Sequence, residues 1–296
     1  MRKASIAAAA VLVAALVPAP ASAWGTEAHR YIMGRAIDLL PQELKPFFEH
    51  YRAEIVIRSI DPDTWRSAGW DDDPNHFIDF GMKELGAYPF PDLPREYGAA
   101  LAKFGKATLD RVGRLPWREE EEFGNLRRAF EGLTREVPYA PGDVALFAAI
   151  ASHYMQDAHQ PFHGSVNYDG QLTGNHGIHA RFERDLFERF QSRLTINPAP
   201  PTPILDVRNA AFDILLASYR LVDAILTADS DAIAGKDSYD DAYFEMFFAK
   251  VRPVLERRLA DSITATTGMI MGAWQLAGKP VPALKGARPL QKVRKP

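Results

Sequence analysis

Apolar residues recur every three or four positions along most of the chain, which is the spacing of one face of an α-helix. The first such segment runs from Thr26, which can cap the helix, to Leu40. No stretch alternates apolar and polar residues as a half-buried strand does. The pattern predicts helices over residues 26–40, 42–57, 96–115, 119–135, 178–193, 206–229 and 239–277 (broken at Pro253), and one more from about Gly142 to Pro161.

Polar and proline-rich stretches separate these helices. Residues 59–94 combine Asp, Trp, His and Pro and are expected to form an irregular loop, residues 167–175 a turn-rich loop, and residues 197–203 a rigid linker. The acidic runs 71–73 and 119–122 are expected to be solvated, the second as the first turn of a helix. The chain is therefore expected to be all-α, with a single multi-helix domain over residues 24–278.

The two ends of the chain differ from this domain. Met1-Arg2-Lys3 is a basic start, Ala4 to Val17 is apolar, and Ala21-Ser22-Ala23 is a small-residue cleavage site. This pattern predicts a signal peptide over residues 1–23 and a mature chain that begins at Trp24, exported to the periplasm or the medium. No other stretch is long enough to span a membrane. Residues 279–296, a basic Pro-rich tail with six Lys/Arg and no acid, are expected to be disordered.

Composition restricts the class of protein further. The chain has 296 residues, no Cys and 47% hydrophobic residues, so its stability must come from a core, with any bound metal adding to it, rather than from disulfides. Loss of Arg2 and Lys3 with the leader would lower the formal net charge from −3 by two units, to −5. This balance argues against a protein that binds duplex DNA through a broad basic face. It does not argue against a metal site, because the ions supply their own positive charge.

Histidines and carboxylates gather in one part of the chain. His153 and Asp157 stand four residues apart, as do His179 and Glu183, and such pairs share one face of a helix. His163 follows just past Pro161, where a helix ends or kinks. For one pair alone, a surface helix with polar residues is an equal explanation. The second copy of the geometry favours a metal site, with zinc held at roughly 2.0–2.2 Å from each nitrogen or oxygen.

The predicted start of the mature chain offers another group of ligands. After cleavage, Trp24 would carry a free α-amine beside its carbonyl, five residues before His29. Taken in isolation, Trp24 as a core aromatic residue and His29 as a polar residue of a turn is the better explanation.

These features, in this order, resemble the superfamily of zinc-dependent single-strand-specific nucleases (the S-one and P-one type) and bacterial zinc phospholipases C. The resemblance covers residues 24–278, nearly the whole mature chain. The matching residues are Trp24-Gly25 with His29, Asp63-Thr64-Trp65-Arg66, His76-Phe77-Ile78-Asp79, His153, Asp157, Gln160-Pro161, His163, His179 and Glu183. Each fragment is weak by itself, and the ordered set is specific.

The resemblance implies the fold of that superfamily, with a cleft that holds three Zn²⁺. One zinc would be bound by Asp63, His76, His153 and Asp157, a second by the α-amine and carbonyl of Trp24, His29 and a bridging Asp157, and the third by His163, His179 and Glu183. Carboxylates with imidazoles and no thiolate suit catalytic zinc. Bridged ions about 3.5–4 Å apart activate water and clamp both ends of an in-line phosphoryl displacement.

The resemblance also implies roles for four residues around the metal ions. Asp63 and Arg66 are expected to be catalytic, with the planar guanidinium of Arg66 against the scissile phosphate. Phe77 and Asp79 fall where the nucleases stack a base and hydrogen-bond its edge. Asp61 remains an alternative to Asp63, which is preferred because it keeps the Asp-x-x-Arg spacing with Arg66.

Three functions follow from this comparison. The first is a secreted zinc phosphodiesterase that cuts single-stranded RNA and DNA to 5′-nucleotides, with 3′-nucleotidase activity as a further expectation. The second is a phospholipase C acting on phosphatidylcholine-like lipids, because Glu183 and the short loop between His163 and His179 are phospholipase-like. The third is a metal-binding helical protein without turnover. The N-terminal spacing, Arg66, Phe77 and Asp79 favour the nuclease. We expect the protein to be a monomer.

Overall fold

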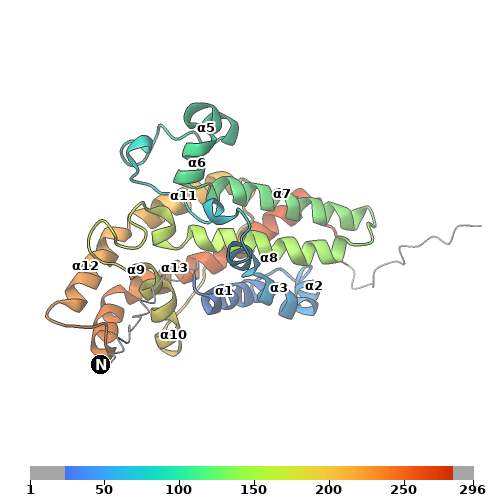
Figure 1. Ribbon diagram of the computed structural model, residues 1–296. Coiled ribbons are helices and arrows are strands. Elements are labelled where there is room, and N and C mark those ends of the chain that lie inside the picture. The colour runs from blue at the N-terminus through green and yellow to red at the C-terminus, as the bar shows by residue number, and fades with distance from the viewer. Residues whose placement is uncertain (1–23, 283–296) are drawn as a thin grey trace, which may run out of the picture.

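A long helix, α8 (Ala140–Ala158), runs through the middle of the molecule in the computed structural model, which describes residues 24–282 (Figure 1). Fourteen of its 19 residues are buried. Six alanines keep it slim and few positions on it are charged, so that neighbouring helices can pack on every side. Within the described residues 67% are helical and none lies in a strand, which confirms the all-α prediction.

Four longer helices and one short one surround α8. Helices α7 (Leu115–Thr134) and α11 (Val207–Tyr219) pack on one side of it, and α1 (Thr26–Asp38) with the short α3 (Arg52–Arg58) on another. Helix α13 (Asp241–Leu276) packs against α8, α7 and α1. One hydrophobic cluster joins all of these helices. It includes Met33 of α1, Ile55 of α3, Leu126 of α7, Met155 of α8, Val207 of α11 and Ile270 of α13.

The remaining helices are short. They are α2 (Lys45–His50), α4 (Asp61–Ser67), α5 (Tyr97–Phe104), α6 (Lys106–Val112), α9 (Ile178–Ala180), α10 (Leu186–Phe190) and α12 (Val222–Ile233). One π-helical turn spans Arg181–Asp185, and 3₁₀ turns cover Asp73–Asn75, Lys83–Leu85, Pro161–Gly164 and Gln191–Arg193. Helices α5 and α6 project from one side of the molecule (Figure 1). A second hydrophobic cluster, with Trp24, Phe182 and Phe247, holds α10, α12 and the first half of α13 to α1.

Several predicted element boundaries are wrong. The segments 42–57, 96–115 and 206–229 are each two helices, interrupted at Tyr51, at Gly105 (φ +73°) and at Arg220–Leu221. Helix α13 continues through Pro253, because Val251 and Leu255 on either side are buried in the core. Residues 61–67 form α4 where a loop was expected, with Pro62 in the first turn, where a missing N–H costs nothing.

Thr26 does not cap α1. Thr26 is the first helical residue, and the N-cap position is Gly25, which has no side chain to cap the helix. The carbonyl of Gly25 accepts the backbone N–H groups of Ala28 and His29 instead. A Cβ at Gly25 would lie 2.9 Å from the side chain of Arg184, so this position needs glycine for a close approach rather than for a capping bond.

The run from Glu119 to Glu122 is not solvated as a whole. Helix α7 begins at Leu115, earlier than predicted, and its second turn faces α8. Glu122 is buried and pairs with Arg118 (Oε1 to Nη2, 3.0 Å). Glu119 is fully buried, neither of its oxygens has a hydrogen-bond partner, and burial raises its pKa well above the usual range.

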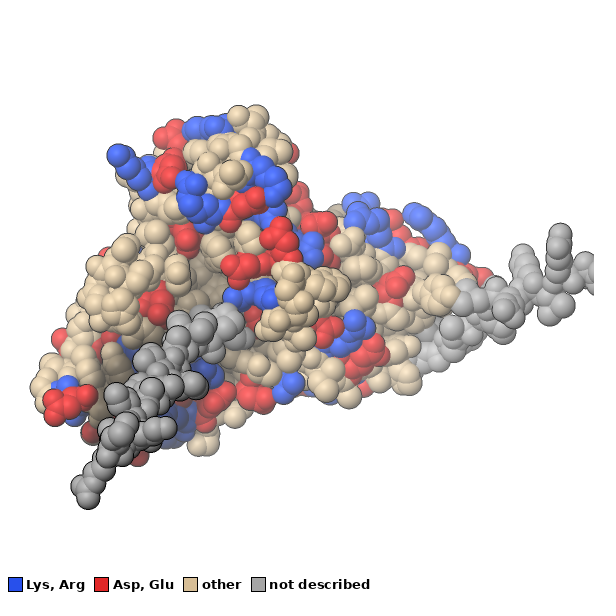
Figure 2. Space-filling view, in the orientation of Figure 1, with Lys and Arg blue, Asp and Glu red and all other residues tan. Residues whose placement is uncertain are grey.

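No helix between residues 24 and 282 has the length and apolar character needed to cross a membrane. The predicted signal peptide (1–23) and all of the predicted tail beyond residue 282 lie outside the described residues. Lys and Arg side chains alternate with Asp and Glu over the face drawn in Figure 2, so this face carries no broad patch of one sign.

Candidate metal centre

All eight side chains that were predicted as metal ligands meet at one end of α8. His153 and Asp157 belong to α8 itself, His29 comes from α1 and Asp63 from α4. The other four come from loops and short turns: His76 follows the turn Asp73–Asn75, His163 lies in the turn Pro161–Gly164, His179 lies on α9, and Glu183 lies in the π-helical turn. Seven of the eight are buried, and the Asp63 side chain is 13% exposed.

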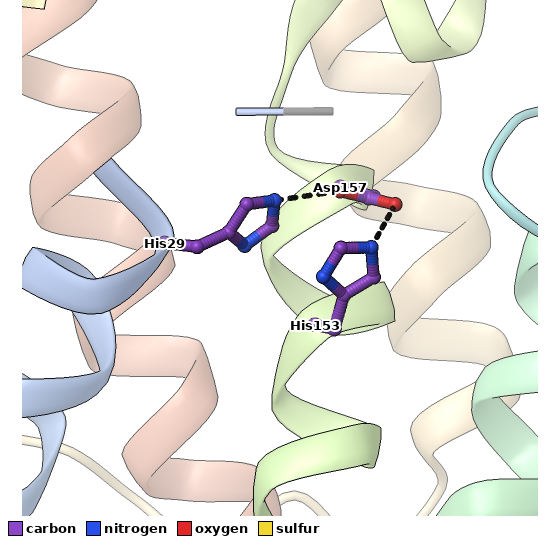
Figure 3. A group of neighbouring side chains, drawn as sticks. All are labelled: His29, His153 and Asp157. Atoms are coloured by element: carbon purple, nitrogen blue, oxygen red, sulfur yellow. Dashed lines mark ion pairs between the residues drawn. The ribbon is translucent and has the colours of Figure 1, made fainter. Parts of the chain in front are cut away.

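The first group consists of His29, His153 and Asp157. His29 reaches from α1 toward Asp157, and His153 lies one turn before Asp157 on the same helix (Figure 3). The Nε2 atoms of His29 and His153 are each 3.3 Å from an Asp157 oxygen, Oδ1 and Oδ2 respectively. The two imidazole rings stack with their centroids 4.3 Å apart. The i, i+4 geometry read from the sequence is therefore present on α8.

A second group shares His153 with the first. Oδ1 of Asp63 lies 3.9 Å from both Nδ1 of His76 and Nε2 of His153. His76 is also close to the first group, because its Nδ1 is 3.0 Å from Oδ2 of Asp157. Asp61 points elsewhere and pairs with Nε of Arg58 at 2.9 Å. The structure thus places Asp63, rather than Asp61, in the cluster.

The third group is His163, His179 and Glu183. Nε2 of His179 is 2.9 Å from Oε2 of Glu183, and one ligand atom of each residue lies within 4.8 Å of the others. This group adjoins the other two, because Nδ1 of His163 is 3.8 Å from Oδ2 of Asp157. Asp157 is the residue that all three groups approach.

The side chains in these groups fit a bound metal ion. Buried polar atoms are normally hydrogen-bonded, and an exception calls for an explanation. Within residues 24–282, Nε2 of His163 and Nδ1 of His179 are buried without a hydrogen-bond partner. Nε2 of His29, Oδ1 of Asp157 and Nε2 of His179 are also buried, and the imidazole–carboxylate contacts they make do not have hydrogen-bond geometry. Imidazole nitrogens and carboxylate oxygens are the donors that divalent metal ions take. The clusters can therefore hold metal ions, and ligation would satisfy these atoms.

In most of these histidines, one ring nitrogen contacts an oxygen of a neighbouring residue, which leaves the other nitrogen for a metal ion. Nδ1 of His29 lies 2.6 Å from Oε1 of Gln156, Nδ1 of His153 2.8 Å from the Ser59 carbonyl, and Nδ1 of His163 2.5 Å from the His76 carbonyl. Glu183 is held in the same way, by Nε2 of Gln160 at 2.8 Å. Such outer contacts orient a ligand and select its tautomer.

Asp72 is the most informative residue that the sequence did not single out. It was expected to be solvated with its neighbours, but it is only 6% exposed. Its Oδ2 lies 3.0 Å from Nε2 of His76 and accepts the hydroxyl of Tyr154 at 2.8 Å. The only sequence signal was its i, i+4 spacing to His76, which is weak because that segment was expected to be a loop. Asp72 turns Nδ1 of His76 toward the cluster.

Burial and neighbouring charges shift the pKa values of the cluster. Burial raises the pKa of Asp157, but His153 and His163 outweigh burial and hold that pKa well below its usual range. Burial lowers the pKa of His153, but Asp157 and Asp63 outweigh it and raise that pKa to about 9. Burial lowers the pKa of His163 to about 3. Asp157 is thus ionised, as a ligand carboxylate must be.

Trp24 and Arg66 lie at the edge of the cluster. The Trp24 side chain is fully buried, and its Nε1 donates to the carbonyl of Gln156, next to Asp157, at 2.8 Å. A ligand role for its α-amine depends on cleavage after Ala23, which lies outside the described residues. Nη1 of Arg66 is 3.4 Å from Oδ1 of Asp63, and its Nε is 2.9 Å from Asp73. The guanidinium is therefore beside a predicted ligand.

Phe77 and Asp79 follow His76 in an extended segment. The Ile78 N–H donates to the His163 carbonyl and the Asp79 N–H to the Val112 carbonyl, at 2.9 and 2.6 Å. Gly113 makes the second contact possible, because a Cβ there would lie 2.2 Å from the Phe77 carbonyl oxygen. Oδ1 of Asp79 is buried without a hydrogen-bond partner, and burial raises the pKa of Asp79 to about 7.

Comparison with known proteins adds no family to these observations. No protein-family model matches the chain, and no curated protein is similar to it. The fold and the site therefore define a class by themselves: an all-α protein with buried histidine–carboxylate clusters that can hold metal ions.

Proposed function

We propose that this protein is an exported zinc-dependent phosphodiesterase that hydrolyses single-stranded RNA and DNA to 5′-nucleotides. The observation that carries the proposal is the convergence of three histidine–carboxylate groups on Asp157, from six segments between residues 29 and 183. The proposal also rests on the ordered resemblance to the zinc-dependent nucleases and phospholipases C.

We assign three zinc ions to the clustered ligands, following the resemblance. Asp63, His76, His153 and Asp157 would hold one, His29 and Asp157 with the backbone of Trp24 a second, and His163, His179 and Glu183 the third. When bound, adjacent zinc ions lower the pKa of water and neutralise the charge of a phosphoryl group. The contribution of this chain is to orient the ligands through Asp72, Gln156 and Gln160.

Arg66 is the residue we assign to the phosphate of the substrate. Its planar guanidinium can donate two parallel hydrogen bonds to phosphate oxygens. Its contact with Asp63 keeps it beside the metal ligands, and the Asp73 contact anchors its Nε. A lysine at this position would keep the charge but lose the fork geometry.

Phe77 and Asp79 favour a nucleic acid as the substrate. Phe77 is half-buried and follows a metal ligand directly, so that its ring can stack on a base. The unpaired Oδ1 of Asp79 can accept a hydrogen bond from a base edge, which would explain why a carboxylate is kept there.

Phospholipase C activity is the second candidate. It is favoured by Glu183, since the last carboxylate is glutamate in the bacterial zinc phospholipases C, and by the short loop between His163 and His179. A third candidate, a metal-binding protein without turnover, keeps the same clusters.

The test uses the chain from Trp24 onward, loaded with zinc. Metal content is measured alongside hydrolysis of a single-stranded DNA oligonucleotide and of phosphatidylcholine vesicles. We expect about three zinc ions per chain and 5′-phosphorylated products from DNA. Arg66→Lys should lower kcat/KM on DNA by roughly 100-fold, as loss of a charge-stabilising donor does. Arg58→Lys, on the neighbouring α3, is the matched control and should keep full activity.

The alternatives give distinct results. Release of diacylglycerol without cleavage of DNA would replace the nuclease with the phospholipase. Stoichiometric zinc with no hydrolysis of DNA, lipid or an activated phosphodiester would leave only the non-catalytic metal-binding protein.

A further inference from the structure

A cavity of about 390 Å³ lies beyond the candidate metal centre, and none of the predicted site residues lines it. Its walls come from the segment after Asp79, from the segment after His163, and from the junction of α11 and α12. The first two walls are joined, because the Val166 N–H donates to the Phe80 carbonyl at 2.9 Å, just as Ile78 donates to His163. The same paired segments therefore lead from the metal ligands to the cavity.

Two tyrosine rings form a flat wall of this cavity. Tyr88 and Tyr219 are nearly parallel, with an interplanar angle of 12° and centroids 6.1 Å apart. Phe90 packs against both rings in T-shaped arrangements, which restrains their orientation. Tyr88 is 47% exposed, whereas its neighbour Phe90 is buried. A held aromatic ring with a solvent-facing surface is a ready platform for another planar ring.

The rim of the cavity carries charged groups that are not used elsewhere. The Arg220 guanidinium and the Asp223 carboxylate are exposed, and neither has a hydrogen-bond or ion-pair partner in the part of the chain that the structure describes. Most other arginines in this molecule pair with a carboxylate, as Arg95 does with Asp213 and Arg208 with Glu120. An unpaired arginine beside stacked tyrosines combines an anion-binding group with a stacking surface.

We propose that this cavity binds one nucleotide of a single-stranded nucleic acid, at a distance from the nucleotide that is cut. The base stacks on Tyr88, Arg220 binds a backbone phosphate, and the Asp223 carboxylate accepts a hydrogen bond from the sugar or the base. The proposal rests on the nuclease function above and extends it, because it gives the enzyme a second contact with the same strand along the paired segments.

The geometry favours a base over the trimethylammonium group of a choline lipid. Aromatic cages for quaternary ammonium groups surround the cation with several ring faces. Here the two rings are nearly parallel, which is the arrangement of a stacking surface and not of a cage. Stacking on one aromatic face is the way in which single-stranded nucleic acid is held without sequence preference.

The experiment measures binding of deoxyadenosine 5′-monophosphate to the zinc-loaded protein by calorimetry, with hydrogen exchange to locate it. We expect slower exchange in peptides that cover residues 165–167 and 219–223. Tyr88→Ala and Arg220→Gln should each weaken binding at these peptides at least about five-fold, as loss of a stacked base or a phosphate contact does. They should also raise KM for a single-stranded hexanucleotide.

Tyr139→Ala and Arg135→Gln are the matched controls. Tyr139 is 53% exposed and the Arg135 side chain 72% exposed, and both lie at the turn between α7 and α8, away from the cavity. Both should bind and cleave like the unaltered protein. Equal melting temperatures and zinc contents show that the effects of Tyr88→Ala and Arg220→Gln are local.

The outcomes separate this proposal from the proposed function. The cavity proposal is overturned, and the nuclease function left intact, by one result: Tyr88→Ala and Arg220→Gln bind the nucleotide and show a hexanucleotide KM like the unaltered protein. Binding of phosphocholine at residues 219–223 in preference to the nucleotide also overturns it. A third result is that the protein binds the nucleotide at these peptides, both variants weaken that binding, and DNA is not cut. This result supports nucleotide binding in the cavity and rules out the nuclease function.

Discussion

Asp72 and Asp79 are both buried carboxylates near His76, but they differ in their partners. Asp72 receives hydrogen bonds from Tyr154 and Asn75 and contacts His76, and these groups outweigh burial and hold its pKa below the usual range. Asp79 has an unpaired oxygen, and burial alone raises its pKa to about 7. A carboxylate that is poorly satisfied in the folded protein is expected where a ligand completes its contacts.

Asp79 should make the free energy of unfolding depend on pH. Because its pKa is raised in the folded state, its contribution to stability is fully present below about pH 4 and is lost as the pH rises to about 7. Asp79→Asn removes this loss, so the stability of the variant relative to the unaltered protein should rise by on the order of 4 kcal/mol between pH 4 and pH 8. Urea denaturation at both pH values measures the difference.

Asp71→Asn is the matched control, since Asp71 is exposed and should leave the pH dependence unchanged. An Asp79→Asn protein with the pH dependence of the unaltered chain would show that Asp79 is ionised, and therefore partnered, at neutral pH. The same variant should alter cleavage of oligonucleotides of different bases if Asp79 contacts a base edge.

At the scale of elements, the segment that carries His179 and Glu183 is held by a buried polar network. The guanidinium of Arg181 donates to Asp229 of α12 (Nη2 to Oδ1, 2.9 Å) and to the Asn175 and His176 carbonyls. Asp229 also accepts from Tyr243 and from Asn175. The π-helical turn Arg181–Asp185 therefore has its first residue anchored to two other helices. Such turns often occur at functional sites.

Asp229→Asn should weaken both the fold and the third metal group. Removing one partner of a buried ion pair leaves an uncompensated charge, here on Arg181, and costs about 3–5 kcal/mol. We also expect the loss of the metal ion held by His163, His179 and Glu183, because the π-helical turn loses its anchor. Calorimetric melting and metal analysis measure the two effects.

Asp231→Asn, on the same helix, is the matched control. It removes only an exposed ion pair with Lys250, so it should change the free energy of unfolding by less than about 0.5 kcal/mol. If Asp229→Asn were destabilised but kept its full metal content, the network would support the fold without positioning the ligands.

At the scale of the whole molecule, the candidate metal centre joins segments from residue 29 to residue 183. Buried polar atoms without hydrogen-bond partners lower the free energy of unfolding, and the three groups contain several of them. Because metal binding would satisfy these atoms, it should raise the stability of the entire fold. The six segments include α1 and α8, which also share the core with α13. Their melting should be cooperative.

Removal of metal should therefore lower the melting temperature. Free zinc at 100 times its dissociation constant stabilises a single-site protein by about 2.7 kcal/mol, which corresponds to a shift of roughly 5–10 °C. Dialysis against a chelator and re-addition of zinc, followed by circular dichroism, measure this shift. Asp157→Asn should abolish it, because Asp157 approaches all three groups, whereas Asp71→Asn should retain it. A zinc-independent melting temperature would argue against a built metal centre.

The positions of the ligands were predictable to different degrees. The pairs His153–Asp157 and His179–Glu183 follow from i, i+4 spacing and are found in contact. Asp63 and His76 came only from the resemblance, and His29, which its spacing to Trp24 did not favour in isolation, was added by it. All three meet the pairs in space. Asp72 was missed, because a carboxylate in an acidic run has no signal that separates an exposed side chain from a buried one. Glu119 was missed for the same reason.

The helical composition, the ligand types and the two histidine–carboxylate pairs were determined by the sequence alone, since periodicity and i, i+4 spacing act within one segment. The tertiary structure decided the rest. It brought α1, α4 and the 72–79 segment to the end of α8, buried Asp72 and Glu119, and joined residues 78–80 to residues 163–166. These contacts depend on packing between distant segments, which no local pattern encodes.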